Sequence, residues 1–200
     1  MVCTDGIAQR GHAVFGYIQD KRGGAVMKIL VVVDMQNDFV DGALGTQEAV
    51  GIVPAVAEKI KSFEGRVLYT RDTHESDYLE TQEGKNLPVP HCIRGTKGWE
   101  ICPQIEALRR EAPIDKPVFG SAELGQMLKD YDSQEEKITS VTFIGLCTDI
   151  CIISNAMIVK AFLPETEIIV DAACCAGVTP ESHRQALEAM KVCQIRVVNE

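Results

Sequence analysis

Short apolar runs alternate along this chain with amphipathic segments, and this alternation limits the folds that are open to it. The run ILVVV (29–33) is continuous and rich in β-branched residues, as expected of a strand that is buried on both faces. Further strands are predicted at residues 66–72, 114–120, 140–146, 167–173 and 194–198. Helices are predicted at residues 48–63, 99–110, 121–130, 149–163 and 180–192. Strands separated by helices form a mostly parallel sheet covered on both sides, so we predict an α/β fold with three layers and a six-stranded sheet.

Length and charge narrow the class of protein further. A chain of 200 residues suits one domain with a full hydrophobic core. The net charge of -9 argues against a nucleic-acid partner, which would require a clustered basic surface. No apolar run approaches the roughly 20 residues that a membrane-spanning helix needs, so we expect no membrane partner.

The first residues of the chain differ from the rest. Residues 1–26 have neither an apolar core nor a helical period, whereas the core-like pattern MKILVVVD begins at Met27. We therefore expect residues 1–26 to be a poorly ordered extension and residues 27–200 to be the folded domain. A short N-terminal strand or arm is the alternative. No secretory signal precedes the eight cysteines, which are spread too thinly for a disulfide scaffold, so we expect a cytoplasmic protein with reduced thiols.

The chemically capable side chains gather just past the predicted strand ends. They are Asp34, Asp72 with His74, Lys116, Cys147 with Cys151, and Asp171. In parallel sheets ligands bind beyond the carboxyl ends of the strands, so we expect these side chains at one edge. The residues MQNDF that follow Asp34 distinguish it from a simple turn cap, and Lys116 in the same cleft would stabilise a thiolate.

The stretch GLCTDIC (145–151) places two cysteines four residues apart. Cys151 lies in the first turn of a predicted helix, where the helix dipole lowers the pKa of a thiol and favours the nucleophilic thiolate. Two buried cysteines that only pack against their neighbours are the alternative. A zinc site built on this pair is disfavoured because no second cysteine or histidine cluster follows at zinc-finger spacing, and a CxxC redox motif is absent.

A second group of residues has the composition of a metal site. Asp72 and His74 directly follow a predicted strand, and His91 lies in the long polar loop after them. Imidazole and carboxylate ligands together suit zinc, iron(II) or manganese, and Glu83 in the loop offers a further oxygen. The other two of the four histidines lie outside this loop.

Several motifs together carry a family resemblance. The chain resembles the isochorismatase-like cysteine hydrolases, and within them the nicotinamidases, through VVVDMQNDF, the D-x-H of RDTH, PHCIRGT, KPVFGSAEL and GLCTDICI, in this order. The resemblance runs from about Met27 to the C-terminus, which is the whole of the predicted domain. It implies the isochorismatase-like hydrolase fold.

The resemblance also implies roles for single residues. Asp34, Lys116 and Cys151 match the family's catalytic triad, with Cys151 as the nucleophile, Asp34 as the proton acceptor and donor, and Lys116 as the activating charge. Leu146–Cys147 matches a cis peptide bond of the family. The backbone N–H groups of Cys147 and Cys151 would then form the oxyanion hole.

The implied metal site uses the loop already singled out. Asp72, His74 and His91 match the metal ligands of the nicotinamidases, and Glu83 is the candidate for a fourth ligand. We therefore expect a divalent metal, with zinc as the first choice and iron or manganese as alternatives.

The sequence departs from the family pattern at two places, one of them in the expected substrate pocket. Phe39 matches an aromatic residue that walls the pocket. Nicotinamidases often have a second aromatic residue shortly before the later metal histidine, but this sequence has NLPVPH there, so Leu87 or Pro88 would take its place. Position 147 is usually a small residue, and here it is cysteine.

The activity that the resemblance implies is hydrolysis of a small aromatic amide, nicotinamide above all, to the acid and ammonia through a cysteine thioester. A metal-independent hydrolase of another small amide, a carbamoyl compound or a vinyl ether is the first alternative. A non-catalytic binding protein and a redox protein with a Cys147–Cys151 disulfide are the others. Homo-oligomers are common in the family, so we expect one here.

Overall fold

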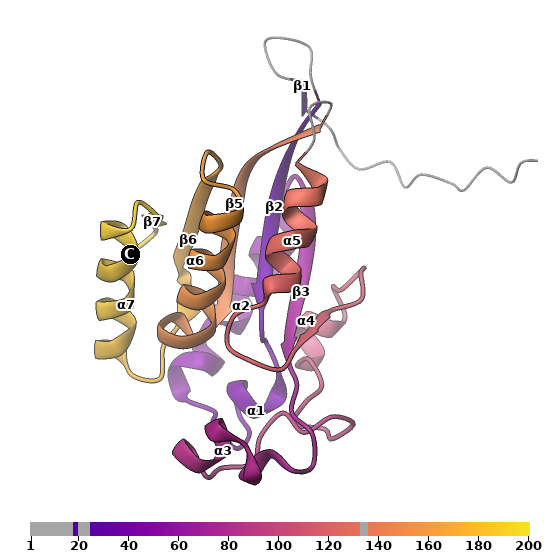
Figure 1. Ribbon diagram of the computed structural model, residues 1–200, viewed down its shortest axis with the longest axis vertical. Helices are drawn as coiled ribbons and strands as arrows, with labels where there is room; N and C mark the ends of the chain where they lie inside the picture. The colour runs from indigo at the N-terminus through magenta and orange to yellow at the C-terminus, as the bar shows by residue number, and fades with distance from the viewer. Residues whose placement is uncertain (1–17, 20–24, 133–135) are drawn as a thin grey trace, which may run out of the picture.

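The structure, a computed structural model, describes residues 18–19, 25–132 and 136–200. Its main sheet has the strand order β4-β3-β2-β5-β6-β7, and every neighbouring pair on this path is parallel (Figure 1). The strands are β2 (Ala25–Val33), β3 (Arg66–Asp72), β4 (Ile114–Lys116), β5 (Glu136–Leu146), β6 (Glu167–Ala176) and β7 (Arg196–Val198). The prediction of a six-stranded, mostly parallel sheet is confirmed.

Helices cover both faces of this sheet and so complete the three predicted layers (Figure 1). α5 (Ala122–Tyr131) and α6 (Ile153–Phe162) lie on one face, and α2 (Gln47–Ser62) lies on the other. The remaining elements are α1 (Asn37–Val40), α3 (Gln82–Asn86), α4 (Pro103–Glu106), α7 (Pro180–Val192), the 3₁₀ turn η1 (Tyr78–Glu80) and the π-helical turn η2 (Thr148–Ile152). No helix in the described ranges is long and apolar enough to cross a membrane.

Strand β2 shows why the sheet is covered on two sides. Successive side chains of a strand point to opposite faces, and both faces of β2 are apolar. Val31 belongs to a core cluster that includes Leu124 of α5, whereas Val32 belongs to a second cluster that includes Val56 of α2. All four side chains are at most 1% exposed, so the continuous apolar run reflects burial on both faces.

The helix starts follow the capping residues in the sequence. The Ser121 side chain accepts a hydrogen bond from the Leu124 N–H at 3.0 Å and caps α5. Thr179 caps α7 in the same way through the Ser182 N–H, and Pro180 occupies the first helical position. Both starts agree with the predicted ones.

The helix predicted over residues 99–110 is wrong, because only Pro103–Glu106 (α4) is helical. Tertiary contacts hold the preceding residues in another conformation. The Trp99 indole N–H donates to Thr73 Oγ1 at 2.8 Å, and the guanidinium of Arg71 lies 3.4 Å from the centre of the Trp99 ring. Ile101 forms an isolated antiparallel bridge with Gln36. These partners are distant in sequence, so the local apolar spacing did not reveal them.

Strand β5 leads directly into the predicted nucleophile turn. Gly145 near its end has a φ of +114°, and a Cβ at this position would lie 2.2 Å from the Val33 carbonyl oxygen. Only glycine adopts this φ readily and, having no Cβ, leaves room for the Val33 carbonyl. The Leu146–Cys147 peptide bond is cis, as the family resemblance implied, and the turn η2 follows in place of the first turn of the predicted helix.

Most of the N-terminal extension lies outside the described residues, namely 1–17 and 20–24. Strand β1 (Ile18–Gln19) pairs antiparallel with the start of β2, where Ile18 lies opposite Val26. Strand β2 itself begins at Ala25, slightly ahead of the predicted domain start at Met27.

Candidate active site

The carboxyl ends of β2, β4 and β5 bring the predicted triad together at the end of the sheet that carries α1 and α3, and the end of β3 adds Asp72 (Figure 1). The Lys116 ammonium nitrogen, at the end of β4, lies 2.7 Å from Asp34 Oδ2. The same nitrogen lies 3.4 Å from Cys151 Sγ and 3.2 Å from Asp72 Oδ1. All four side chains are buried, so the charges interact away from bulk water.

The local backbone conformation and a hydrogen bond from β3 fix the position of Asp34. Its backbone has a φ of 48°, which turns the chain away from β2 after Val33. Thr70 of β3 donates a hydrogen bond from Oγ1 to Asp34 Oδ1 at 2.8 Å. Burial raises the pKa of Asp34, and the positive charge of Lys116 only partly offsets this effect. Asp34 is therefore a better proton acceptor than an ordinary aspartate.

The protonation of Lys116 and Cys151 follows from the same burial. Burial disfavours the ammonium of Lys116, but the carboxylates of Asp34 and Asp72 outweigh this effect and raise the pKa of Lys116 well above 10.5. Burial, and next the carboxylate of Asp34, raise the pKa of Cys151 well above the usual 9.0. The lowered thiol pKa predicted from the helix start is therefore wrong, and a base is needed to take the thiol proton.

The nucleophile turn is braced by hydrogen bonds to three other segments. Asn155 is fully buried, and its side-chain amide donates to the carbonyl oxygens of Cys151 at 2.8 Å and Phe119 at 3.0 Å. Thr148 Oγ1 lies 2.8 Å from His183 Nδ1 on α7. The carboxylate of Asp149 accepts the Val178 N–H at 3.1 Å. These hydrogen bonds restrict movement of the turn relative to the sheet.

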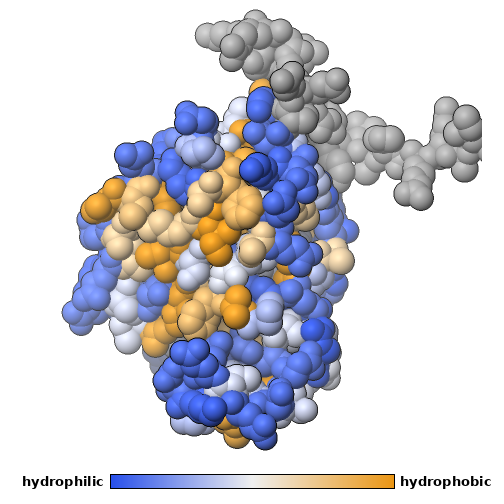
Figure 2. Space-filling view, in the orientation of Figure 1, coloured by the Kyte–Doolittle hydropathy of each residue, from blue (hydrophilic) through white to orange (hydrophobic). Residues whose placement is uncertain are grey.

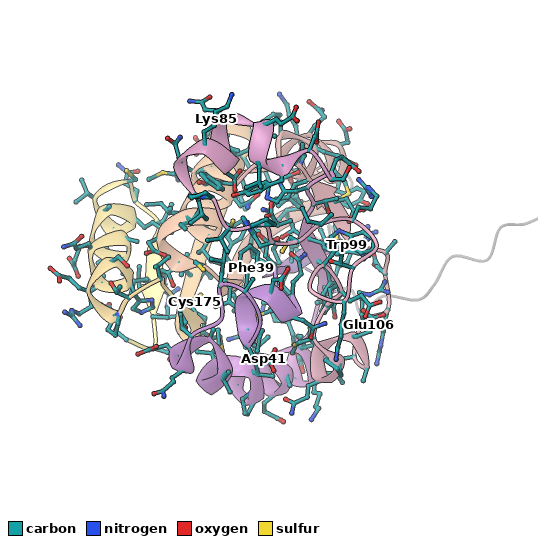
Figure 3. The ribbon with its side chains drawn as sticks, turned by 90° about the horizontal axis from the view of Figure 1, so that it is seen from below. Phe39, Asp41, Lys85, Trp99, Glu106 and Cys175 are labelled. Carbon is teal, nitrogen blue, oxygen red and sulfur yellow. The ribbon has the colours of Figure 1, made fainter. Side chains whose placement is uncertain are left out.

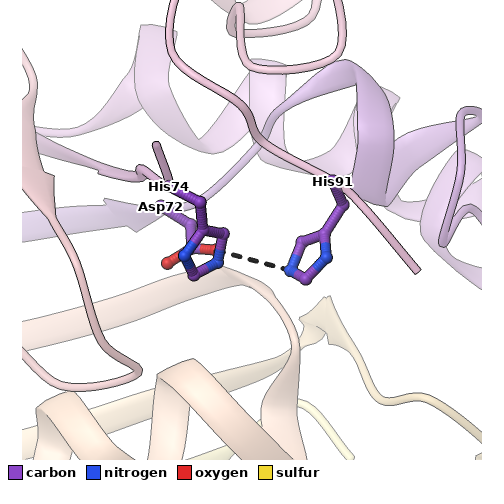
Figure 4. A group of neighbouring side chains, drawn as sticks. All are labelled: Asp72, His74 and His91. Atoms are coloured by element: carbon purple, nitrogen blue, oxygen red, sulfur yellow. Dashed lines mark ion pairs between the residues drawn. The ribbon is translucent and has the colours of Figure 1, made fainter. Parts of the chain in front are cut away.

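A possible metal-binding group lies next to the triad (Figure 4). One ligand atom from each of Asp72, His74 and His91 lies within 4.8 Å of the others. Asp72 Oδ2 lies 2.9 Å from His74 Nε2 and 3.7 Å from His91 Nε2. Burial alone would raise the pKa of Asp72, but the hydrogen bond from His74 and the charge of Lys116 lower it, so Asp72 would offer a metal an anionic carboxylate.

Glu83 offers a fourth ligand atom close to those of Asp72, His74 and His91. Its Oε1 lies 3.5 Å from His74 Nε2 and 3.8 Å from His91 Nε2. Ligands at zinc–ligand distances of about 2.1 Å in a tetrahedron are about 3.4 Å apart, which lies within the range seen here. His74 Nε2 is buried, with the carboxylate oxygens of Asp72 and Glu83 as neighbours at 2.9 and 3.5 Å. His91 donates from Nδ1 to the Val89 carbonyl at 2.8 Å, which leaves Nε2 free to bind a metal. These residues fit a divalent cation.

A cavity of about 620 Å³ connects the two groups. Cys151 and Cys147 line it together with Asp72, His74, Glu83 and His91, and Phe39 and Leu87 form part of its apolar wall. Val118 and Phe119 line it as well and are 56% and 44% exposed, which places them at its mouth. Figure 3, viewed from this end of the molecule, shows Phe39 of α1 near the middle and Lys85 of α3 at the rim.

Asp171 was expected at this edge of the sheet, and that prediction is wrong. Strand β6 continues to Ala176, so Asp171 lies within the strand and away from its carboxyl end. Its carboxylate pairs with Lys59 of α2 at 2.7 Å and accepts a hydrogen bond from Asn199 at 2.9 Å. Asp171 therefore joins α2 to the sheet.

Several polar side chains that contact the site were given no role from the sequence. They are Gln36 and Asp38 of the MQNDF stretch, Thr70, Thr148 and Asn155. The only sequence signal for the first two was the unusual polar run after a buried strand. His183, which fitted no metal group, instead contacts the nucleophile turn, and His12 lies outside the described residues.

The chain is similar to several known proteins over most of its length. The nicotinamidase/pyrazinamidase of Mycobacterium tuberculosis is 25% identical over 185 residues, which cover 86% of this chain and 98% of that protein. The nicotinamidase of Schizosaccharomyces pombe is 27% identical over 209 residues, with 86% and 92% covered. A solved structure, the pyrazinamidase of Pyrococcus horikoshii in complex with zinc, is 27% identical with a TM-score of 0.71 and covers 87% of this chain and 99% of its own.

The family assignment rests on nearly the full length of the chain. A family model described as the isochorismatase domain matches residues 28–199. These residues include β3 to β7 in full, β2 from Lys28 onwards, and all side chains of the two groups described above. The chain therefore belongs to the isochorismatase family.

Proposed function

We propose that this protein is a metal-dependent amidohydrolase that converts nicotinamide, or a similar small aromatic amide, to the acid and ammonia. The observation that carries the proposal is that the Cys151 thiol and the ligand group around Asp72 line one cavity. One small molecule can therefore contact both. The similarity to proteins named nicotinamidase supports this substrate class.

Zinc is the metal that we propose, with iron or manganese as alternatives. Asp72, His74 and His91 would hold it, and Glu83 would be the fourth ligand. Two imidazoles with carboxylate oxygens suit zinc, and the similar pyrazinamidase structure is a complex with zinc. When bound, the metal would supply a Lewis acid that orients the substrate.

The first half of the reaction would form a thioester on Cys151. As the Cys151 sulfur forms a bond to the amide carbon, its proton passes to Asp34, whose raised pKa makes it a suitable base. The backbone N–H groups of Cys147 and Cys151 would hold the resulting oxyanion. Lys116 stays positively charged and stabilises the negative charge on the groups around it. Asp34 then gives the proton to the leaving nitrogen, the C–N bond breaks, and ammonia leaves.

The second half would release the acid. A water molecule attacks the thioester carbon while Asp34 accepts one of its protons. The C–S bond breaks, and the proton returns to the Cys151 sulfur. One amide and one water thereby become one acid and one ammonia, and the enzyme groups end in their starting protonation states.

The remaining features of the proposal concern the whole chain. We propose that residues 27–200 form one cysteine hydrolase domain, which agrees with the family match over 28–199.

We also propose a cytoplasmic location, which would keep the Cys151 thiol reduced, as the reaction requires. A homo-oligomer is supported by the apolar side chains that gather on the face covered by α5 and α6 (Figure 2), and the mass in solution would test it.

The deciding experiment is an ammonia-release assay on nicotinamide, pyrazinamide, a carbamoyl amide and an aliphatic amide, with and without a metal chelator. We expect turnover of the pyridine and pyrazine amides that the chelator removes and zinc restores. Turnover of the carbamoyl amide alone, unaffected by chelator, would instead support the metal-independent alternative. A Cys151→Ala variant that still releases ammonia would contradict the thioester mechanism.

A further inference from the structure

The polar run after Asp34 has no part in the proposed chemistry, yet its side chains hold the loop that carries the metal ligands. Gln36 and Asp38 lie at the start of α1, between β2 and the loop of residues 73–98. Each makes a hydrogen bond to a backbone group of a metal ligand or of its direct neighbour. The contacts span a sequence separation of 36 residues for Gln36 and 54 for Asp38.

Gln36 replaces a missing strand partner of Asp72. Strand β2 ends at Val33, so the last residue of β3 has no β2 residue beside it in the register. The Gln36 amide fills this position: its Oε1 accepts the Asp72 N–H at 2.7 Å, and its Nε2 donates to the Asp72 carbonyl at 2.9 Å. Nε2 also donates to the Trp99 carbonyl at 2.9 Å. The side chain is 0% exposed, so a primary amide is the group that fits this site.

Asp38 acts in a similar way on His91. Its Oδ2 accepts the Cys92 N–H at 2.7 Å, and this N–H belongs to the peptide unit that joins Cys92 to His91. The Cys92 carbonyl in turn accepts the His74 N–H at 3.0 Å. A single carboxylate therefore fixes the backbone beside one ligand directly and that of a second ligand through one further hydrogen bond.

We propose that Gln36 and Asp38 are positioning residues that set the affinity of the ligand group Asp72, His74 and His91 for its metal. The inference rests on the proposed metal-dependent function. Partners that orient metal ligands from outside the coordination sphere typically contribute about 10–100-fold to metal affinity. The same short segment follows Asp34 directly, so it also links the proposed base to the metal group.

The test measures zinc affinity by competition with a chromophoric chelator, using the purified full chain. Asp38→Ala should weaken zinc binding by about 10–100-fold, and Asp38→Asn by less, because an amide oxygen can still accept the Cys92 N–H. Gln36→Met, which keeps the length of the side chain but removes its amide, should weaken zinc binding to a similar extent. Alkylation of Cys151 in metal-free protein should be unchanged in all three variants, since none of these contacts touches the triad directly.

A matched control separates positioning from general loss of stability. Thr46→Ala removes the cap of α2, a hydrogen bond of 3.0 Å from the Ala49 N–H, without touching the metal loop. It should lower the thermal midpoint but leave zinc affinity unchanged. The proposal is overturned if Asp38→Ala and Gln36→Met bind zinc as tightly as the wild type, or if Thr46→Ala weakens zinc binding as much as they do. A wild-type protein that binds no divalent metal would overturn the proposed function itself, which is a different outcome.

Discussion

Asp72 Oδ1 lies 3.2 Å from the Lys116 ammonium nitrogen, while the other oxygen of the same carboxylate lies 2.9 Å from His74 Nε2. One buried carboxylate therefore contacts Lys116 of the predicted triad and is also part of the possible metal-binding group. A change in either group will alter the electrostatic field in the other, because the low-dielectric surroundings screen these charges weakly.

The first prediction concerns the buried charge of Lys116. Lys116→Met leaves the carboxylates of Asp34 and Asp72 without their cation, so the free energy of unfolding should fall by about 3–5 kcal/mol. Denaturant unfolding at neutral pH would measure it. The double variant Asp34→Asn with Lys116→Met should recover part of the loss, because it removes one of the uncompensated charges. Equal stability of the wild type and the single variant would contradict this account of the triad.

The second prediction concerns the nucleophile. Cys151→Ala should lower turnover by a factor of the order of 10⁴ or more, as expected when a covalent nucleophile is removed, while the fold is retained. Cys193→Ala is the matched control, because this exposed cysteine lies outside the cavity lining, and its turnover should be unchanged. Mass spectrometry after an acid quench should find the acyl group on Cys151. An acyl group on another cysteine would refute the assignment.

The third prediction concerns the metal. Zinc that binds only the folded state stabilises it by about 2.7 kcal/mol at a concentration 100 times its Kd, so added zinc should raise the thermal midpoint of chelator-treated protein. His74→Ala should lose this effect because it removes a ligand. His183→Gln alters a histidine outside the group and should keep it. If both variants respond to zinc alike, the metal binds elsewhere.

The fourth prediction concerns the pH dependence of kcat/KM. Asp34 must be deprotonated to accept the thiol proton, and its pKa is raised above 3.8 by burial. Activity should therefore fall with decreasing pH at a higher pH than the titration of an ordinary aspartate. Lys116 keeps its charge past pH 10.5, so it should not cause the loss of activity on the alkaline side. An acid limb at or below pH 3.8 would argue against Asp34 as the base.

The fifth prediction concerns His183, which contacts the nucleophile turn through Thr148. Burial lowers the pKa of His183 below 6.5, so the folded state favours the neutral imidazole. The unfolded chain takes up the proton first as the pH falls below about 6.5, and the folded state loses stability from there towards the lower folded pKa. Unfolding curves measured from pH 8 to pH 5 should show a smaller loss of unfolding free energy for His183→Gln than for the wild type. Parallel losses in the two proteins would show that His183 does not contribute.

The strands could be predicted from the sequence because the signal for each is local. Strand β3 has the predicted bounds, Arg66–Asp72, and the apolar run 29–33 lies within β2. Parallel pairing then placed the strand ends at one edge, and this rule was sufficient to bring Asp34 and Lys116 into one group before any distance was known. It failed for Asp171, because the apolar pattern does not show that β6 continues to Ala176.

Tertiary structure decided the properties that depend on partners distant in the sequence. The helix dipole suggested a low pKa for Cys151, but burial beside Asp34 raises it. Gln36 and Asp38 contact residues of the metal loop that no local period connects to them. A sequence pattern records which side chains face the core, because burial repeats with the period of each element. Hydrogen bonds and charge interactions depend on distances of a few ångströms between segments, and those distances exist only after the chain has folded.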